Sequence, residues 1–115
     1  MNLMKLIQIL FHIVLFDKDK PIGTGRCYVD NSDQKCFHIG RITVLKEYRK
    51  YHLGNIIMKE LENHIKEVGG NTIQLSSQVT AKKFYSKLGY QEEGEEYLDE
   101  FCPNVKMIKK FMIYY

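Results

Sequence analysis

Cysteine is scarce in this chain, and the few that occur fit neither a disulfide framework nor a zinc site. Cys27, Cys36 and Cys102 are odd in number and include no Cys-x-x-Cys spacing. The combination of Cys27, Cys36 and His38 also matches no zinc pattern. Free thiols are typical of a reducing compartment, so we expect a cytoplasmic protein without a metal site.

Long apolar runs are also missing, which argues against a membrane segment. The run 6–16 is interrupted by Gln8 and His12, and it is shorter than the ~20 residues that a spanning helix needs. A signal peptide is the alternative interpretation, but no small-residue cleavage site precedes Asp17. The β-branched and aromatic content favours a buried strand, and no membrane partner is expected.

A strong charge of either sign is absent. The 17 basic and 14 acidic residues leave a net charge of +3, and no basic stripe with interleaved aromatics occurs. Binding to nucleic acid is therefore the least favoured function. With 115 residues, 44% of them hydrophobic, and no internal repeat or low-complexity linker, the chain is expected to form a single domain over 1–115.

Hydrophobic patterning predicts strands over 7–16, 22–29 and 36–45, separated by polar turns. Gly23 and Gly25 suggest a bulge in the second strand. A loop over 46–53 leads into a helix whose apolar face carries Ile57, Leu61, Ile65 and Val68 and which ends at Gly69-Gly70. A strand over 72–76, a helix over 80–88 and a strand over 105–114 follow. This order predicts a mixed α/β sheet in which the first helix connects two parallel strands.

The strongest functional signal is the basic loop followed by a helix start at Gly54. A helix N-terminus presents free backbone N–H groups and a partial positive charge, and glycine allows a phosphate to approach the backbone. Two common phosphate-binding patterns, the P-loop and the Gly-x-Gly-x-x-Gly turn, are absent. The helix start itself is therefore the predicted anion site.

The loop resembles the Arg/Gln-x-x-Gly-x-Gly/Ala signature of the GNAT superfamily of acyl-CoA-dependent N-acetyltransferases. In this chain the signature begins at Arg49, and His52 stands where the first glycine is usual. A second segment, 78–90, resembles the family's Asn/Gln-x-x-Ala-x-x-x-Tyr-x-x-x-Gly-Phe/Tyr helix. Segments 93–97 and 103–107 are similar to the small YjcF-like branch, so the resemblance covers roughly 14–110.

This resemblance implies an α/β (α+β) fold with a mixed, mostly antiparallel central sheet flanked by helices. GNAT domains usually begin with a further strand and two helices that wall the acceptor pocket, and this chain starts after them, so an N-terminally short version is expected. An exposed sheet edge and apolar patch would then remain, and a homodimer is expected to cover them.

The resemblance also implies where acetyl-CoA, the co-substrate, binds. Backbone groups near the end of the third strand line the pantetheine arm, and the loop and helix start hold the pyrophosphate. Lys82, together with Lys83 and Lys87, is placed near the 3′-phosphate, although a solvated helix face is the competing interpretation. The expected cofactor-binding residues are Ile42, Thr43, Val44, Arg49, Lys50, His52, Leu53, Gly54, Asn55, Gln78, Lys82 and Tyr85.

Amide formation needs a group that takes a proton from the amine and one that protonates the leaving thiolate. Tyr85 falls on the tyrosine that serves as the family's general acid, and packing beside Phe84 is the alternative role. His38 is the candidate base, because strand alternation predicts that it shares a face with Ile42 and Val44, and histidine titrates near neutrality. A water relay from backbone carbonyls or Glu47 is left open.

The favoured function is an acetyl-CoA-dependent N-acetyltransferase that moves an acetyl group directly to a primary amine of a small molecule or protein. None of the cysteines matches a family nucleophile. The alternative is a non-catalytic acyl-CoA-binding or interaction module, suggested by His52 and the missing N-terminal wall. Acidic residues over 92–100 could attract a cationic amine, or they could simply form a solvated turn.

Overall fold

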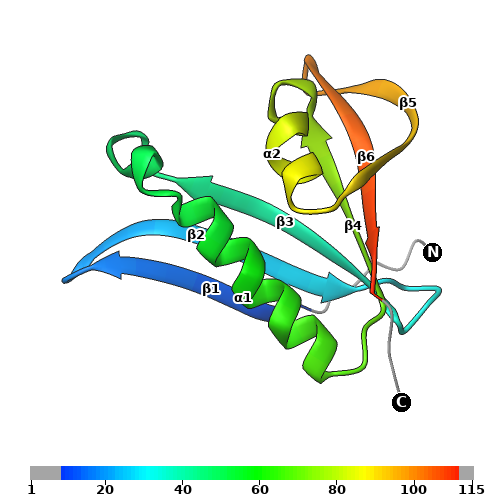
Figure 1. The fold of residues 1–115 in the computed structure, drawn as a ribbon, viewed down its shortest axis with the longest axis horizontal. Coiled ribbons are helices and arrows are strands. Elements are labelled where there is room, and N and C mark those ends of the chain that lie inside the picture. Colours follow the sequence, from blue (N-terminus) through cyan, green and yellow to red (C-terminus); the bar gives the residue numbers. More distant parts are fainter. Residues whose placement is uncertain (1–8, 112–115) are drawn as a thin grey trace, which may run out of the picture.

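A computed structural model describes residues 9–111 of the chain. Its six strands form one sheet in the order β1-β2-β3-β4-β6-β5 (Figure 1). All neighbouring strands pair antiparallel except β3 and β4, which are parallel and are connected through α1. The predicted mixed, mostly antiparallel sheet is therefore confirmed. The elements are β1 Ile9–Asp17, β2 Lys20–Val29, β3 Cys36–Val44, α1 Leu53–Glu67, β4 Thr72–Gln78, α2 Lys82–Lys87, β5 Gln91–Asp99 and β6 Cys102–Lys110.

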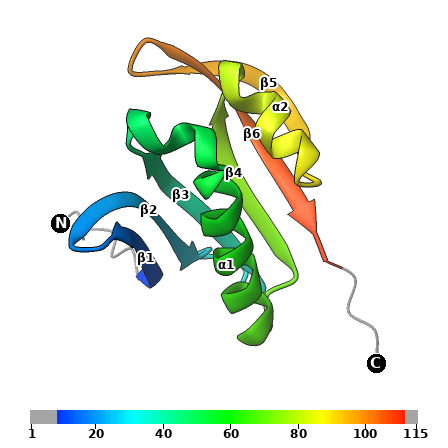
Figure 2. The same ribbon diagram turned by 60° about the vertical axis from the view of Figure 1, so that its left-hand side comes forward.

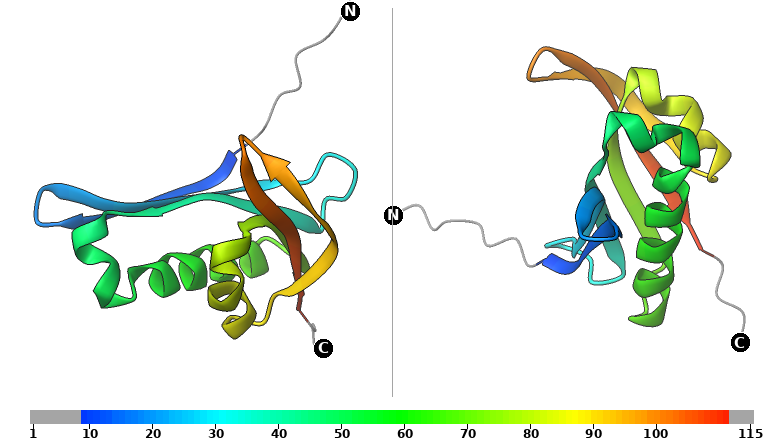
Figure 3. Two further views of the ribbon diagram at one scale, coloured as in Figure 1. Left: turned by 90° about the horizontal axis from the view of Figure 1, so that it is seen from above. Right: turned by 90° about the vertical axis from the view of Figure 1, so that its left-hand side faces the viewer.

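The parallel pair at the centre of the sheet is short. β3 and β4 pair only at Cys36 with Thr72, Phe37 with Ile73, and His38 with Gln74. Beyond this point the two strands diverge, and the sheet opens into two arms (Figures 1 and 2). One arm contains β1, β2 and β3, and the other contains β4, β6 and β5. Figure 3 shows α1 and α2 on the same side of the first arm; we call the opposite side the far face.

A β-bulge in β3 changes which residues face the helices. Arg26 of β2 pairs with Gly40, whereas Thr24 pairs with Thr43, so β3 contains one extra residue between them. Arg41 occupies this position with a φ of 57°, in the left-handed region. The bulge resets the alternation of side chains along the strand.

The predicted common face of His38, Ile42 and Val44 is therefore wrong. Ile42 and Val44 pack against the core that α1 covers, together with Phe37 and Ile39. His38, between those two core residues and before the bulge, lies on the far face. Strict two-residue alternation could not predict this, because it assumes a strand without an inserted residue.

The core lies between α1 and both arms of the sheet. Ile57, Leu61 and Ile65 of α1 are fully buried, as the helical periodicity predicts, and Met58 is buried beside them. The prediction that Val68 shares this face is wrong, because Val68 follows the last turn and is 49% exposed. Gly25 allows this close packing, because a Cβ at its position would lie 2.6 Å from Cγ2 of Ile57. The predicted bulge in the second strand is also present, because Leu15 pairs with Gly23 and Phe16 with Pro21, which leaves one extra residue in β2.

Two segments differ from the predicted elements. Residues 91–99, predicted as an acidic connection, form the edge strand β5, whose residues are all exposed. Glutamate-rich sequence has low strand propensity, so this strand depends on its backbone pairing with β6. The predicted loop 46–53 contains a 3₁₀ helix, η1, over Lys46–Tyr51. Positions 7–8 and 112–114 of the predicted terminal strands lie outside the described residues.

The edge strand of the other arm carries exposed apolar side chains. Val14 and Phe16 of β1 are 41% and 59% exposed. The homodimer expected to cover such an edge stays a prediction. Within residues 9–111, no helix combines the length and the apolar character required to cross a bilayer.

A buried polar cluster connects α1 to the second arm. Glu62 is only 8% exposed. Its carboxylate accepts a hydrogen bond of 2.7 Å from the Tyr90 hydroxyl and forms an ion pair with Nζ of Lys109 at 3.1 Å. Burial and the nearby Glu62 charge raise the pKa of Tyr90, so its hydroxyl remains a donor. Because α1 packs on β2 and β3 while Lys109 lies in β6, the cluster fixes the two arms relative to each other.

Removing the Glu62 carboxylate should destabilise the fold strongly. We expect Glu62→Leu to lower the free energy of unfolding by about 3 kcal/mol, the low end for a broken buried pair, because Lys109 remains partly exposed. Tyr90→Phe removes only one hydrogen bond to a charged group and should cost about 1.5 kcal/mol. Urea denaturation measures both, with Glu60→Gln on the exposed side of α1 as the control. An equal loss from Glu60→Gln and Glu62→Leu would contradict the assignment.

Candidate active site

The divergence of β3 and β4 leaves a cavity of about 560 Å³ between the arms. Both sides of the gap contribute side chains, and α2 closes one end. The lining residues are Ile39, Gly40, Arg41, Ile42, Thr43, Val44, Arg49, Leu75, Ser76, Gln78, Ala81, Tyr85, Asp99 and Asn104. The cavity therefore depends on the early end of the parallel pairing.

A second cavity, of about 220 Å³, extends this space to the start of α1. It shares Val44 and Arg49 with the larger cavity and is otherwise lined by His52, Gly54, Asn55 and Phe84. The two together form a path from the gap in the sheet to the N-terminus of the helix.

The start of α1 is suited to an anion. The first N–H groups of a helix have no partner within the helix, and the first turn of α1 contains no acidic residue. Arg49 lies beside this turn and donates from Nε to the Val44 carbonyl at 3.1 Å, which ties the loop to the end of β3. Asn55 lies within the first turn, and its N–H donates to the His52 carbonyl at 3.2 Å.

His52 adopts the backbone conformation that a glycine would take. Its φ of 58° and ψ of 32° place it in the left-handed region, between η1 and α1. A non-glycine residue in this region carries a modest energetic cost. The histidine therefore forms the left-handed turn that leads from η1 into α1.

Gly54 makes room for a neighbouring helix as well as for a ligand. A Cβ at this position would lie 3.1 Å from Cζ of Phe84. The Phe84 ring thus closes the side of the smaller cavity against the first turn of α1. A large residue at position 54 would displace Phe84 together with any ligand.

Tyr85 lies in α2 and lines the larger cavity. Its ring packs edge-on against Phe84, with the ring centroids 5.0 Å apart, and against Tyr90 at 6.0 Å. Burial raises the pKa of Tyr85, so the hydroxyl is protonated at neutral pH and can donate a proton. Tyr85 therefore packs beside Phe84 and lines the cavity at the same time, so the two roles predicted for it do not exclude each other.

The structure brings most of the predicted cofactor-binding residues together. Ile42, Thr43, Val44, Arg49, Gln78 and Tyr85 line the larger cavity, and His52, Gly54 and Asn55 line the smaller one. Lys50, Leu53 and Lys82 line neither of these two cavities.

The predicted lysines are engaged elsewhere. Nζ of Lys50 lies 5.3 Å from the centroid of the Tyr51 ring, and Lys82 pairs with Glu92 at 3.2 Å. Lys83 and Lys87 are exposed. The contact of Lys82, Lys83 and Lys87 with the 3′-phosphate stays a prediction, with a solvated helix face as its alternative.

Sequence reasoning missed several lining residues, including Arg41, Ser76 and Asn104. The bulge turns Arg41 into the gap, and β5 and β6 bring Asp99 and Asn104 to it. The acidic residues over 92–100 were predicted to attract a cationic amine or to form a solvated turn, and Asp99 is the one of them that lines this cavity.

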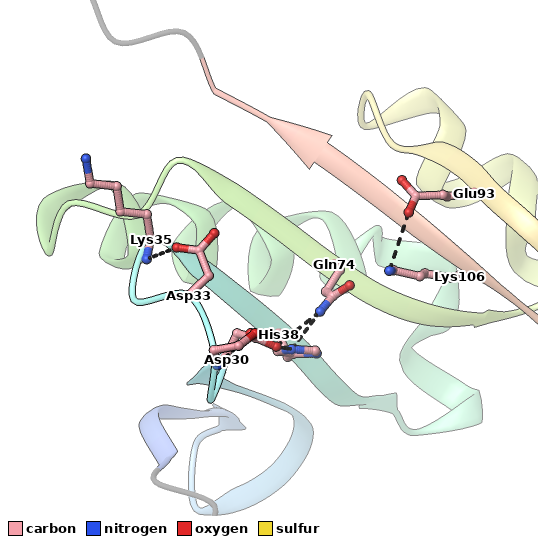
Figure 4. A network of polar contacts seen from close by, with 8 residues as sticks. Asp30, Asp33, Lys35, His38, Gln74, Glu93 and Lys106 are labelled. Atoms are coloured by element: carbon pink, nitrogen blue, oxygen red, sulfur yellow. Dashed lines mark hydrogen bonds and ion pairs between the residues drawn. The ribbon is translucent and has the colours of Figure 1, made fainter.

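His38 lies apart from Tyr85, in a polar network on the far face (Figure 4). Its Nε2 is 2.7 Å from Oδ1 of Asp30 and 2.7 Å from the side-chain amide of Gln74. A third cavity, of about 230 Å³, is lined by His38, Gln74, Leu75, Ser76, Tyr97 and Lys106. The candidate base and the candidate acid are therefore on opposite sides of the sheet.

The cysteines take no part in these cavities. Cys27 and Cys36 are buried, and burial raises the pKa of Cys27 to about 11 and also raises that of Cys36. Cys102 is exposed. Among residues 9–111, no three metal-ligating side chains gather into a potential metal site.

Comparison with known proteins agrees with this geometry. A family model described as the acetyltransferase (GNAT) domain matches residues 4–111. The uncharacterized protein YyaT of Bacillus subtilis is 40% identical over 99 residues, which are 86% of this chain and 65% of YyaT. The uncharacterized N-acetyltransferase YjcF of the same organism is 39% identical, over 85% of this chain and 69% of YjcF. The chain thus spans about two thirds of the length of these relatives.

A crystal structure supports the same fold. An aminoglycoside 6'-N-acetyltransferase complexed with coenzyme A superposes with a TM-score of 0.77, covering 90% of this chain and 73% of that one. Its sequence identity is 18%, so the likeness concerns the fold alone.

Proposed function

The chain belongs to the GNAT family of acetyltransferases, and on this basis we propose that it transfers an acetyl group from acetyl-CoA to a primary amine. The observation that carries the proposal is the continuous path from the gap between β3 and β4 to the start of α1. Such a path suits an elongated molecule with an extended arm and a phosphorylated end. The acceptor is a small-molecule or protein amine.

The pantetheine arm is expected along β3. Because β3 and β4 stop pairing at His38 and Gln74, the backbone of residues 42–44 has no β4 partner, although the Val44 carbonyl already accepts a hydrogen bond from Arg49. Unpaired strand groups form hydrogen bonds readily with an added extended segment. The amides of pantetheine provide such a segment.

The pyrophosphate is expected at the first turn of α1. The N–H groups at residues 52–54 and the positive end of the helix dipole favour a phosphate there, the Asn55 side chain lines the same cavity, and Arg49 adds a full charge. No acidic side chain in the first turn opposes it.

Tyr85 is the proposed general acid. Its hydroxyl belongs to a side chain that lines the same cavity, and its raised pKa keeps the proton in place until a thiolate forms. A phenol buried beside Phe84 and Tyr90 is also held in one orientation.

A non-catalytic acyl-CoA-binding module is the competing proposal, because it would use the same two cavities. The crystallised aminoglycoside acetyltransferase is described with coenzyme A bound, which supports the cofactor class. The two proposals differ in whether the protein acetylates an amine, because the non-catalytic module would bind acetyl-CoA without transferring the acetyl group.

Asn55→Asp should weaken acetyl-CoA binding without harming the fold. An aspartate in the first turn of α1 interacts favourably with the helix dipole but repels a phosphate. We expect the Kd measured by calorimetry to rise about tenfold or more, equivalent to ~1.4 kcal/mol. Asn63→Asp, the same change on the exposed side of α1, is the matched control. Equal affinities of the two variants would place the phosphates elsewhere, and no binding by the folded wild-type protein would refute the proposal.

Tyr85→Phe should lower turnover while leaving acetyl-CoA bound. Loss of a general acid is expected to reduce kcat about 10²-fold, whereas the ring packing is preserved. A panel of primary amines, assayed by release of free CoA thiol, provides the measurement, and Tyr48→Phe in η1 serves as the control. Binding without turnover of any amine by the wild-type protein would favour the non-catalytic module. Full activity of Tyr85→Phe would remove the acid role.

A further inference from the structure

One polar atom of β2 has no partner in the fold. Nε of Arg26 is buried and forms no hydrogen bond within the described residues. Nor does Arg26 take part in the ion pairs of this part of the chain, whose cations are histidines and lysines. Buried donors without a partner are rare in folded proteins, and a guanidinium group is always charged. The free protein thus leaves a cationic group unsatisfied at this position.

Strand register places Arg26 on the far face, beside Gly40. The residues before and after it, Gly25 and Cys27, face the core, because Gly25 lies against α1 and Cys27 is fully buried. Arg26 therefore points to the opposite side of the first arm, away from α1 and α2 (Figure 3). Its partners across the sheet are His12 of β1 and Gly40 of β3.

Gly40 provides open space next to Arg26. A Cβ built on Gly40 would meet no atom within 4 Å, so close packing does not require a glycine there. Gly40 also lines the larger cavity, so the surroundings of Arg26 adjoin the candidate active site at this residue. A small group over Gly40 therefore lies between the arginine and the cavity.

A second arginine follows Gly40 at the bulge. Arg41 is exposed and lines the larger cavity, and no carboxylate of residues 9–111 pairs with it. Its φ of 57° costs free energy for a residue that has a Cβ, and such strain is concentrated at functional sites. Arg26 and Arg41 thus place two charges beside Gly40 that the described chain does not neutralise by an ion pair.

The phosphates of the cofactor do not account for these two charges. Their proposed site is the first turn of α1, beside Arg49. Arg41 precedes Val44, a strand residue that lines both cavities, by three positions, or ~10 Å along a strand. A cofactor with its pyrophosphate at α1 and its arm along β3 therefore directs its acyl end toward Gly40 and the two arginines.

We propose that Arg26 and Arg41 bind a carboxylate of the acceptor, so that the acceptor is an amine that also carries an acid group, such as an amino acid. This inference rests on the proposed function. A guanidinium group holds a carboxylate through two parallel N–H donors, which fixes the direction of the bound molecule. Arg26 gives up no hydrogen bond at Nε when it turns toward the space over Gly40, because this atom has no partner in the free protein.

A single carboxylate lines the larger cavity, and it suits the other end of such a molecule. Asp99 is the one acidic side chain among the described lining residues, and it does not pair with Arg41 although both line the same space. An amino acid arrives with an ammonium group and a carboxylate, so separated charges of opposite sign attract its two ends. Asp99 is assigned to this attraction only, because the amine must lose a proton before it attacks.

Asp30, the acidic residue that follows β2, does not compete for the arginines. Its Oδ1 lies 2.7 Å from Nε2 of His38. Its Oδ2 accepts hydrogen bonds from the Ser32 hydroxyl at 2.7 Å and the Ser32 N–H at 3.0 Å. Both carboxylate oxygens are therefore engaged within their own turn and strand, and the space over Gly40 is left to a ligand.

The test compares acceptors that differ only in the acid group. The common α-amino acids and β-alanine, each beside its amide, are assayed with acetyl-CoA by release of free CoA thiol. We expect kcat/KM of the wild-type protein to be about tenfold or more higher for an accepted acid than for its amide, the effect of one charge-assisted hydrogen bond. Arg26→Gln and Arg41→Gln should each bring this ratio close to one.

Two controls accompany these variants. Lys59→Gln makes the same change of charge on the exposed side of α1, and it should keep the wild-type ratio. The Kd for acetyl-CoA, measured by calorimetry, should stay at the wild-type value in Arg26→Gln, which places the loss at the acceptor. A ratio that is retained in both arginine variants would overturn the assignment.

Arg26→Met distinguishes a binding role from a structural one. The change removes an unpaired buried donor and keeps a long apolar side chain, so Tm should stay at or above the wild-type value. A fall in Tm of about 4 °C or more would identify Arg26 as a structural residue and would overturn its role in binding.

The remaining outcomes separate this inference from the proposed function. If the wild-type protein binds acetyl-CoA and acetylates amines, but prefers amides or amines without an acid group, this inference alone fails. It also fails alone if acetate or inorganic phosphate accelerates acetylation of an uncharged amine, because the arginines would then hold a free anion. If the wild-type protein acetylates no amine, both fail.

Discussion

The early end of the parallel pairing between β3 and β4 is the constraint on which the rest of the structure depends. Three paired positions hold the strands together, and after His38 and Gln74 they separate. The separation exposes one edge of β3 to a ligand and creates the larger cavity. A fully paired β3 and β4 would leave no room for the proposed cofactor path.

Such a split sheet needs support elsewhere, because the hydrogen bonds between two strands are missing along most of their length. The helix α1 supplies it. Its buried face packs on the first arm through Ile57 and Leu61, while Glu62 contacts Tyr90 and Lys109 of the second arm. The same helix begins at the proposed phosphate site, so the element that stabilises the opening also contributes to binding. Stability and function are thus connected through one element.

The sequence predicted the elements that depend on apolar periodicity and on local motifs. The three first strands, the buried face of α1, the parallel crossover and the loop at Arg49 and Gly54 could all be identified, and the resemblance placed Tyr85 beside the cavity. The bulge at Arg41 could not, because one inserted residue leaves no mark on composition, and it moved His38 to the opposite face. The strand β5 was not predicted because its Glu-rich sequence has low strand propensity and no alternation of apolar and polar residues.

The most direct measurement of the central claim is a crystal structure of the protein with desulfo-CoA. The account predicts the pantetheine arm between β3 and β4, hydrogen-bonded to the backbone of residues 42–44, with the pyrophosphate on the N–H groups at the start of α1. A bound cofactor that lies outside this gap, or a complex in which β3 and β4 pair along their full length, would contradict it.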